Sequence, residues 1–242
     1  AVQVRGDETS ARGQLRGRLA GAETPERYSF RFRGGGTEVL DCFLANRRFT
    51  GQVDTEAARL AIDLDPSTGG PVAVVDIGEA MRVHRSLFDD PPFPSEWLAV
   101  ELPADVSTAE DLRRVLGADL SAMALSSTVP PPGRAVAAAA LEVADQVVRI
   151  EQATVDGEVT DGFRISIEPS RYAQQAATEP PGRRSPLAEP DEVVPEFDVW
   201  VDGEGWVRKV TVRPKNPDGT NRPAEEAWTT EYLPQAESVP AM

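Results

Sequence analysis

Few side chains in this sequence of 242 residues are of a type that could carry out chemistry. Its one histidine, His84, lies between arginines in "MRVHRSLF", which favours a surface or structural role over general-base catalysis. Its one cysteine, Cys42, lies in the apolar run "EVLDCFLANRRF", which favours a small buried residue over a reactive thiol and excludes an intramolecular disulfide. There is no nucleophile elbow, Walker motif or paired-carboxylate motif with supporting context. We therefore predict no catalytic residue and no enzyme activity.

Metal binding is also not predicted. Calcium is the metal that would suit a chain with 40 aspartates and glutamates. The two acidic loops "DLDPSTGG" and "NPDGTN" nevertheless lack the spacing of a calcium-binding loop. A single cysteine rules out a cysteine-based metal cluster, so the sequence predicts neither a metal nor another cofactor.

The charge of the chain limits its partners. Lysine and arginine number 25, which gives a formal net charge of −15 and a pI of about 4.6. Such a chain repels the phosphate backbone of nucleic acids at long range, so no nucleic-acid partner is predicted. No window approaches the roughly 20 apolar residues that a membrane span needs, and the first residues do not resemble a signal peptide.

The most regular stretch is "EFDVWVDGEGWVRKVTVRP", residues 196–214, which holds two of the four tryptophans. Alternation predicts one apolar face on each of two strands, formed by Phe197, Val199 and Val201 and by Trp206, Val210 and Val212. Asp202 and Gly203 are a strong hairpin signal between them. Trp200 falls on the opposite face, where covering a sheet edge or packing under a loop is favoured over touching a ligand. Ligand contact by Trp200 or Trp206 stays open.

Periodicity divides the rest of the chain into strands and helices of one predicted domain, 1–242. We expect an N-terminal helix at 8–22, strands within 28–103, a helical plug at 107–143 and strands within 146–233, with a long loop at 170–196. Within the first group of strands the runs are 28–33, 39–45, 59–64, 72–77, 80–87 and 96–103. Consecutive strands without helical crossovers predict an α+β fold with one antiparallel sheet and the helices on a single face.

Four segments, taken together and in order, are similar to the LppX/LprG-type lipoproteins of actinobacteria, which share the LolA-like fold. The segments are "VHRSLFDDPPFPSEWLAVELP", "TAEDLRRVLG", "VVRIEQATVDGEVTDGFRISIEP" and "FDVWVDGEGWVRKVTV". The closing "WTTEYLPQAESVPAM" extends the resemblance over most of the chain from about Tyr28 onward. The family's lipidated N-terminal cysteine is absent here, and Cys42 lies in the middle of a predicted strand.

The resemblance implies a strongly curved antiparallel half-barrel whose concave face holds helices and a hydrophobic cavity. It further implies an extracytoplasmic protein, monomeric and anchored through a lipid on residues upstream of this chain, that carries or binds a lipid or lipoglycan. The residues expected to face this cavity are Leu60, Ile62, Leu64, Leu112, Leu116, Leu120, Met123, Phe163, Ile165, Val199 and Val201. For each of them, plain packing in the core is the alternative.

A second hypothesis belongs to another class of function. The LolA-like fold also serves in periplasmic regulators whose half-barrel binds a peptide of a partner protein or a lipid signal. The chain would then be an interaction or sensor module of the cell envelope with no transport role. Acidic residues around 189–196 could meet a basic partner.

Overall fold

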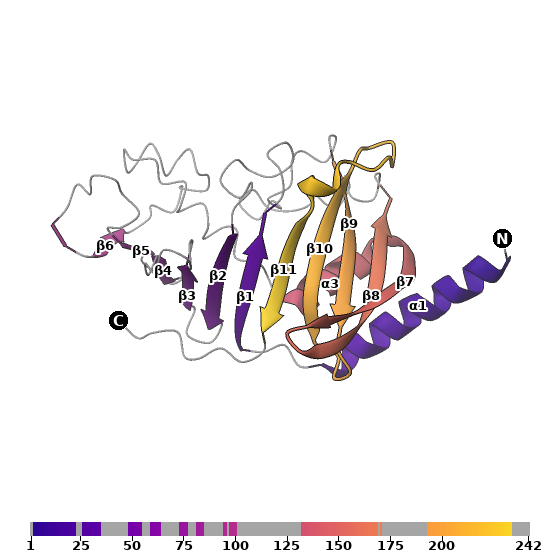
Figure 1. The fold of residues 1–242 in the computed structure, drawn as a ribbon, viewed down its shortest axis with the longest axis horizontal. Coiled ribbons are helices and arrows are strands. Elements are labelled where there is room, and N and C mark those ends of the chain that lie inside the picture. The colour runs from indigo at the N-terminus through magenta and orange to yellow at the C-terminus, as the bar shows by residue number, and fades with distance from the viewer. Residues whose placement is uncertain are drawn as a thin grey trace.

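The structure is a computed structural model that describes residues 2–22, 26–34, 48–54, 59–63, 73–76, 81–84, 94–95, 97–100, 132–168, 170 and 193–233. Figure 1 shows the helices and strands in these ranges. The helices are α1 (Val2–Gly21), α3 (Gly133–Glu142) and the 3₁₀ helix η3 (Ala224–Glu226). The strands are β1 (Arg27–Arg33), β2 (Arg48–Asp54), β3 (Arg59–Asp63), β4 (Ala73–Asp76), β5 (Met81–His84), β6 (Trp97–Val100), β7 (Ala144–Val155), β8 (Glu158–Ile167), β9 (Val194–Val201), β10 (Val207–Lys215) and β11 (Trp228–Leu233).

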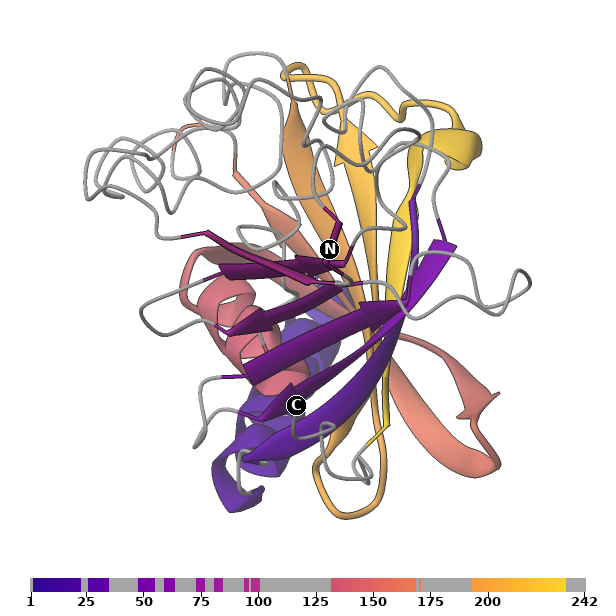
Figure 2. The ribbon, with the colours of Figure 1, turned by 90° about the vertical axis from the view of Figure 1, so that its left-hand side faces the viewer.

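Nine of the strands form one antiparallel sheet in the order β4-β3-β2-β1-β11-β10-β9-β8-β7, and β5 pairs with β6 separately. β1 pairs with β2 on one side and with β11 on the other, so the first and last strands of the described chain lie next to each other. The sheet is strongly curved and stays open, with the helices on its concave side (Figure 2). The predicted fold class is therefore confirmed.

The two α-helices cover one half of the concave face. α1 packs mainly on β7, and α3 packs mainly on β10. The apolar stripe of α1 consists of Ala11, Leu15 and Leu19, all buried and spaced four residues apart. Four glycines in α1 weaken its intrinsic helix propensity, so packing on the sheet must supply much of its stability.

Polar contacts fix α1 against the sheet at both ends of this packed stripe. The Arg12 guanidinium donates to the carbonyl oxygens of Ala144 and Asp145 at 2.8 Å each. Near the end of the helix, Arg18 donates to the Asp202 carbonyl at 2.7 Å and forms an ion pair with Asp161 of β8. α1 is therefore fixed in position on the concave side of the sheet.

Alternation along the strands gives the sheet two different faces. On β1 the side chains of Tyr28, Phe30 and Phe32 are buried on the concave face, and those of Arg31 and Arg33 are exposed on the convex face. β8 and β9 follow the same rule, with apolar concave residues opposite charged convex ones. The core is therefore the concave layer.

The convex face buries carboxylates under cationic side chains, and two of these carboxylates lie on β9. Asp198 is 0% exposed and accepts two hydrogen bonds from Arg164, at 2.7 and 2.9 Å, and one from Arg213 at 2.6 Å. Glu196 lies one row away and accepts from Lys215 at 2.6 Å. The hydrogen bonds to Asp198 raise the pKa of the Arg164 guanidinium above its ordinary value. Buried charges with this many partners hold strands β8, β9 and β10 in register.

The sequence prediction differs from the structure at two elements near the N-terminus. The helix predicted at 8–22 begins at Val2, six residues earlier, and ends at Gly21. β2 was not predicted as a strand, because Gly51 occupies an inward position where an apolar side chain would have marked the alternation. The predicted strands at 59–64, 72–77, 80–87 and 96–103 are present with shorter bounds, as β3 to β6.

The hairpin between β9 and β10 forms as predicted, but with a longer turn. The Asp202 amide donates to the Trp206 carbonyl at 3.0 Å, and Gly205 rather than Gly203 takes the positive φ of 91°. The Asp202 carboxylate accepts from the amides of Glu204 and Trp206, which stabilises this wider turn. β10 begins at Val207, so Trp206 precedes the strand, and the register with β9 shifts between positions 207 and 209.

The predicted loop 170–196 is three residues too long at its end, because β9 begins at Val194. Proline is uncommon within strands, yet Pro195 lies in β9 and pairs with Pro214 of β10. Each of these prolines lies beyond the last residue that pairs with the other neighbour of its strand, β8 or β11. The missing amide hydrogen therefore costs no ladder hydrogen bond.

Several predictions fall outside the described residues. These are the strand at 39–45 with Cys42, the first helix of the plug and the loop at 171–192. The second helix of the plug is confirmed as α3. Neither α1 nor α3 is both long enough and apolar enough to cross a bilayer.

Candidate functional site

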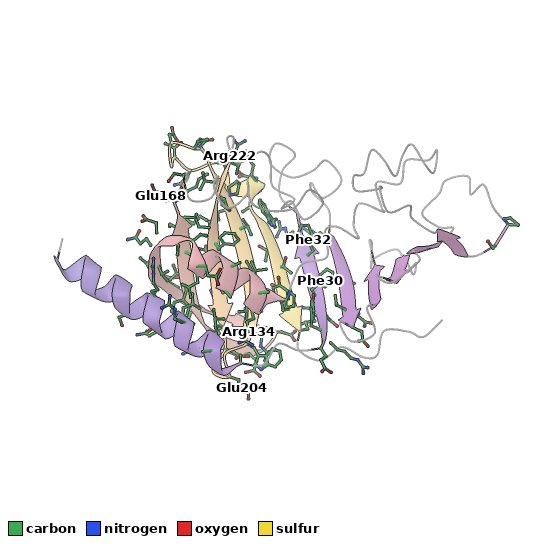
Figure 3. All side chains as sticks on the ribbon, turned by 180° about the vertical axis from the view of Figure 1, so that it is seen from behind. Phe30, Phe32, Arg134, Glu168, Glu204 and Arg222 are labelled. Atoms are coloured by element: carbon green, nitrogen blue, oxygen red, sulfur yellow. The ribbon has the colours of Figure 1, made fainter. Side chains whose placement is uncertain are left out.

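A small pocket lies where the end of α1, the start of α3 and the β9–β10 turn meet the strands β1 and β11. Its volume is about 20 Å³, enough for one water molecule or a methyl group. The lining residues come from five separate segments: Ala22, Tyr28, Pro132, Gly133, Arg134, Gly205, Trp206, Val207, Arg208, Tyr232 and Leu233. Figure 3 shows Arg134 on the concave side, close to the end of α1.

Two glycines let the helices come this close to the sheet. A Cβ atom at Gly133 would lie 2.8 Å from the Tyr232 ring and 2.9 Å from Val207. A Cβ atom at Gly205 would lie 2.4 Å from the Arg18 carbonyl oxygen of α1. The narrowness of the pocket is thus a consequence of residue choice at these positions.

Two tyrosines form the sheet-side wall. The rings of Tyr28 and Tyr232 are 6.2 Å apart between centroids and tilted by 53°. Both are buried, and burial raises the pKa of each phenol above its ordinary value. For Tyr232 the neighbouring Tyr28 adds to the increase. Both phenols are therefore neutral at physiological pH and present an apolar ring with a polar tip.

Two arginines supply the positive charge of the pocket. Arg208 donates to the Asp202 carboxylate at 2.6 Å, and its side chain is only 12% exposed. Arg134 follows Gly133 in the first turn of α3 and is half-buried. Aromatic walls with guanidinium groups beside them suit a ligand that has an apolar part and an anionic or polar end.

The aromatic surface continues from the pocket along the concave face. Phe30 and Phe32 of β1 follow Tyr28 at alternate positions and are 0% and 7% exposed. On the neighbouring strand, Trp228 precedes Tyr232 on the same face and is also buried. Five aromatic rings on two paired strands therefore face the concave side, next to the half of the sheet that α1 and α3 cover.

The predicted cavity residues whose side chains are described do not line this pocket. The four of them whose side chains are described are fully buried on the concave faces of β8 and β9, which α3 packs against: Phe163, Ile165, Val199 and Val201. Leu60 and Ile62 lie on β3, with backbone positions only described. Leu64, Leu112, Leu116, Leu120 and Met123 lie outside the described residues.

The two tryptophans of the hairpin separate to different faces. Trp206 lines the pocket. Trp200 lies on the convex face, with the Lys209 ammonium 5.1 Å from its ring centroid. Its Nε1 would be 3.0 Å from a Cβ atom at Gly162, so the indole packs closely over that glycine. Trp200 therefore packs against neighbouring strands on the convex face.

The sequence predicted strands and helices that carry pocket residues, but it did not predict the pocket itself. Tyr28 stood in a predicted strand and Arg134 at the start of a predicted helix, but no spacing links them, because they are about a hundred positions apart. Among the described residues, no group of three histidine, cysteine, aspartate or glutamate side chains is arranged to hold a metal ion. His84 lies at the end of β5, opposite Trp97 of β6.

Comparison with known proteins gives similar structures only. No family model matches the chain, and no curated protein does. The structure is similar to the lipoprotein LppX of Mycobacterium tuberculosis, with 12% identity, 96% of this chain and 98% of that chain covered, and a TM-score of 0.45. It is also similar to LprF of Mycobacterium bovis, with 7% identity, coverage of 97% and 98%, and a TM-score of 0.48.

The MucA/MucB complex of Pseudomonas aeruginosa is a more distant match. Identity is 12%, 91% of this chain and 55% of that chain are covered, and the TM-score is 0.31. Two of the matched structures, LppX and LprF, are lipoproteins of the type that the sequence resembles.

Proposed function

We propose that this protein binds a hydrophobic, acylated ligand such as a lipid or lipoglycan on the concave side of its sheet, as an extracytoplasmic carrier or binding protein without enzyme activity. The observation that carries the proposal is the aromatic concave surface of β1 and β11, which leads into the pocket between α1, α3 and the β9–β10 turn. An anchor upstream of the chain and a monomeric state belong to the same proposal.

Binding requires more space than the pocket offers. An acyl chain of about 15 methylenes gains on the order of 12 kcal/mol on leaving water, at about 0.8 kcal/mol per methylene, but a bilayer offers nearly the same gain. The site therefore has only to match the membrane, and polar contacts select the ligand. We place the opening between α3 and the sheet, where Gly133 lies against Tyr232 and Val207.

Arg134 and Arg208 give the ligand its orientation in this proposal. Both line the pocket beside the aromatic rings. Arg208 binds the Asp202 carboxylate. Arg134 lies in the first turn of α3 and would move with that helix. A polar or anionic head group beside the arginines leaves the acyl chain to follow the rings of Tyr28, Phe30 and Phe32.

The test is native mass spectrometry of the gently extracted protein, followed by titration with a dansyl fatty acid. Trp206→Ala removes a ring from the pocket, and the matched control Trp200→Ala removes one from the convex face. We expect Trp206→Ala to weaken binding about tenfold, a loss typical of an aromatic anchor, and Trp200→Ala to leave it unchanged. Absence of both co-purified lipid and probe binding in the wild-type protein, or equal losses in the two variants, would overturn the proposal.

A second candidate follows from the small size of the pocket. A volume of about 20 Å³ suits a protein-interaction or sensor module, in which the helices stay closed on the sheet and a partner docks elsewhere. The titration separates the two candidates, because a module of this kind takes up no probe. Both variants would then resemble the wild-type protein.

A further inference from the structure

Most of the cations that the structure describes on the convex face of the sheet are paired with carboxylates. The paired cations are Arg27, Arg31, Arg164, Lys209, Arg213 and Lys215. The closest of these pairs join Arg213 to Asp198 and Lys215 to Glu196, at 2.6 Å each. Cation and carboxylate are matched across this face, as expected for an acidic chain in which each arginine has acids within reach.

Arg33 and Arg48 depart from this rule. They lie directly opposite each other on β1 and β2, at the end of the ladder, and both are exposed. Within the described ranges neither has a carboxylate partner. Like charges directly opposite each other in an antiparallel pair repel. Among the residues whose side chains the structure describes, the pair is therefore a positive charge without a matching carboxylate, on a protein whose net charge is −15.

The neighbours of the pair in the sheet register are two threonines and, beyond Thr50, Asp63 of β3. Thr229 of β11 lies opposite Arg33 on its other side, and its hydroxyl is 3.0 Å from the Thr211 hydroxyl. One row along β2, Thr50 lies opposite Arg31 and is half-buried. Two planar guanidinium groups with hydroxyls beside them match the several oxygens of a phosphate group, which guanidinium binds in a bidentate manner.

We propose that Arg33 and Arg48 form a phosphate-binding site on the convex face of the sheet. The ligand is a single phosphate group, either free or part of a lipid head group. Nucleic acid does not fit, because many phosphates would meet the strongly negative remainder of the protein. The site lies on the face opposite the proposed lipid pocket and does not depend on it.

Thermal melting with inorganic phosphate, at constant ionic strength against chloride, tests the site directly. At ten times the dissociation constant we expect the melting temperature of the wild-type protein to rise by about 3 to 6 °C. Arg33→Gln and Arg48→Gln should each abolish the rise. The matched control is Arg16→Gln, which changes an exposed arginine of α1 and should keep it.

The same variants carry a second signature that needs no ligand. Removing one of two repelling charges should raise the melting temperature at low ionic strength without phosphate, and salt should reduce the difference. Arg16→Gln should show no such gain. The melting curves also show whether the variants fold. We expect them to fold, because both substituted positions are exposed.

A parallel experiment separates the two sources of phosphate. Glycerol 3-phosphate and vesicles of phosphatidylcholine with a minor fraction of phosphatidylglycerol, whose surface charge is low, are compared with inorganic phosphate for the wild-type protein and both variants. Binding that requires both arginines supports the site, and a response to vesicles alone assigns it to a lipid head group. The proposal is overturned when none of the three ligands binds, or when binding persists in Arg33→Gln and Arg48→Gln.

Discussion

Replacing Gly205 with alanine tests how α1 meets the β9–β10 turn, and so tests one wall of the pocket. Gly205 has a φ of 91°, which an L side chain rarely adopts. Its new Cβ would also lie 2.4 Å from the Arg18 carbonyl oxygen and 3.2 Å from the Ala22 Cβ. Because the carbonyl belongs to the backbone of a helix, the whole end of α1 or the whole turn must shift.

The structure provides two glycines that separate these effects. Gly219 has a φ of 83° and open space around its Cβ position, so alanine there costs only the backbone strain, about 1 to 2 kcal/mol. Gly203 has neither a positive φ nor a neighbour within 4 Å, so its alanine variant should stay within about 0.5 kcal/mol of wild type. Gly205→Ala carries the strain and a further 1 to 3 kcal/mol of overpacking, about 2 to 5 kcal/mol in total.

Urea unfolding, followed by tryptophan fluorescence, gives the free energy of unfolding of the three variants. Thermal melting gives a second measure, at about 2 to 4 °C for each kcal/mol in a chain of this size. The reasoning is refuted when Gly205→Ala costs no more than Gly219→Ala, because α1 then does not lie against the turn. It is equally refuted when Gly203→Ala costs as much as Gly205→Ala, because the loss then comes from the turn alone.

Three other substitutions address the charged contacts and the convex face. Asp198→Asn should cost about 2 kcal/mol in urea unfolding, less than a fully buried pair would, because its two guanidinium partners reach solvent. The pKa of Asp161 is lowered below its usual 3.8, mainly by the hydrogen bond from Gln152. The stability that the ionised carboxylate provides is therefore present above pH 3.8 and is lost as the pH falls through the lowered pKa. Asp161→Asn should be destabilised near neutral pH and approach the wild-type protein in acid titrations of unfolding. Gly162→Ala should cost about 1 to 3 kcal/mol in thermal melting, since its Cβ would lie 2.6 Å from the Glu151 carbonyl oxygen. An Asp161→Asn deficit that persists at low pH, or a neutral result for Asp198→Asn or Gly162→Ala, would contradict the corresponding contact.

The sheet could be predicted from the sequence where alternation is uninterrupted. In β1 and β8, buried apolar residues alternate with charged ones, and the structure places them on the expected faces. β2 was missed because Gly51 removes the signal at the middle of the strand. The wider turn was missed because the Asp202 side chain, which accepts two backbone amides, overrides the local Asp-Gly preference.

The pocket could not be predicted, because it depends on contacts between distant segments. The close approach of Gly133 to Tyr232 joins positions 99 residues apart, and no local pattern marks either of them as a pair. Core positions such as Phe163 and Val199 were visible by their period, but periodicity separates inside from outside and not packed core from cavity wall. The fold class was therefore accessible from the sequence and the location of the pocket was not.

The two proposed sites share strand β1 but lie on opposite faces of the sheet. β1 directs Tyr28 toward the pocket and Arg33 toward the convex face, because successive side chains of a strand point to opposite sides. The sheet between them is filled with buried rings on one side and with paired charges on the other. An anion at Arg33 therefore neither enters the apolar layer nor competes with Asp198 and Glu196 for the cations that they already bind. Ligands on the two faces should bind independently, since the strand ladder between them offers no second arrangement through which one site could alter the other.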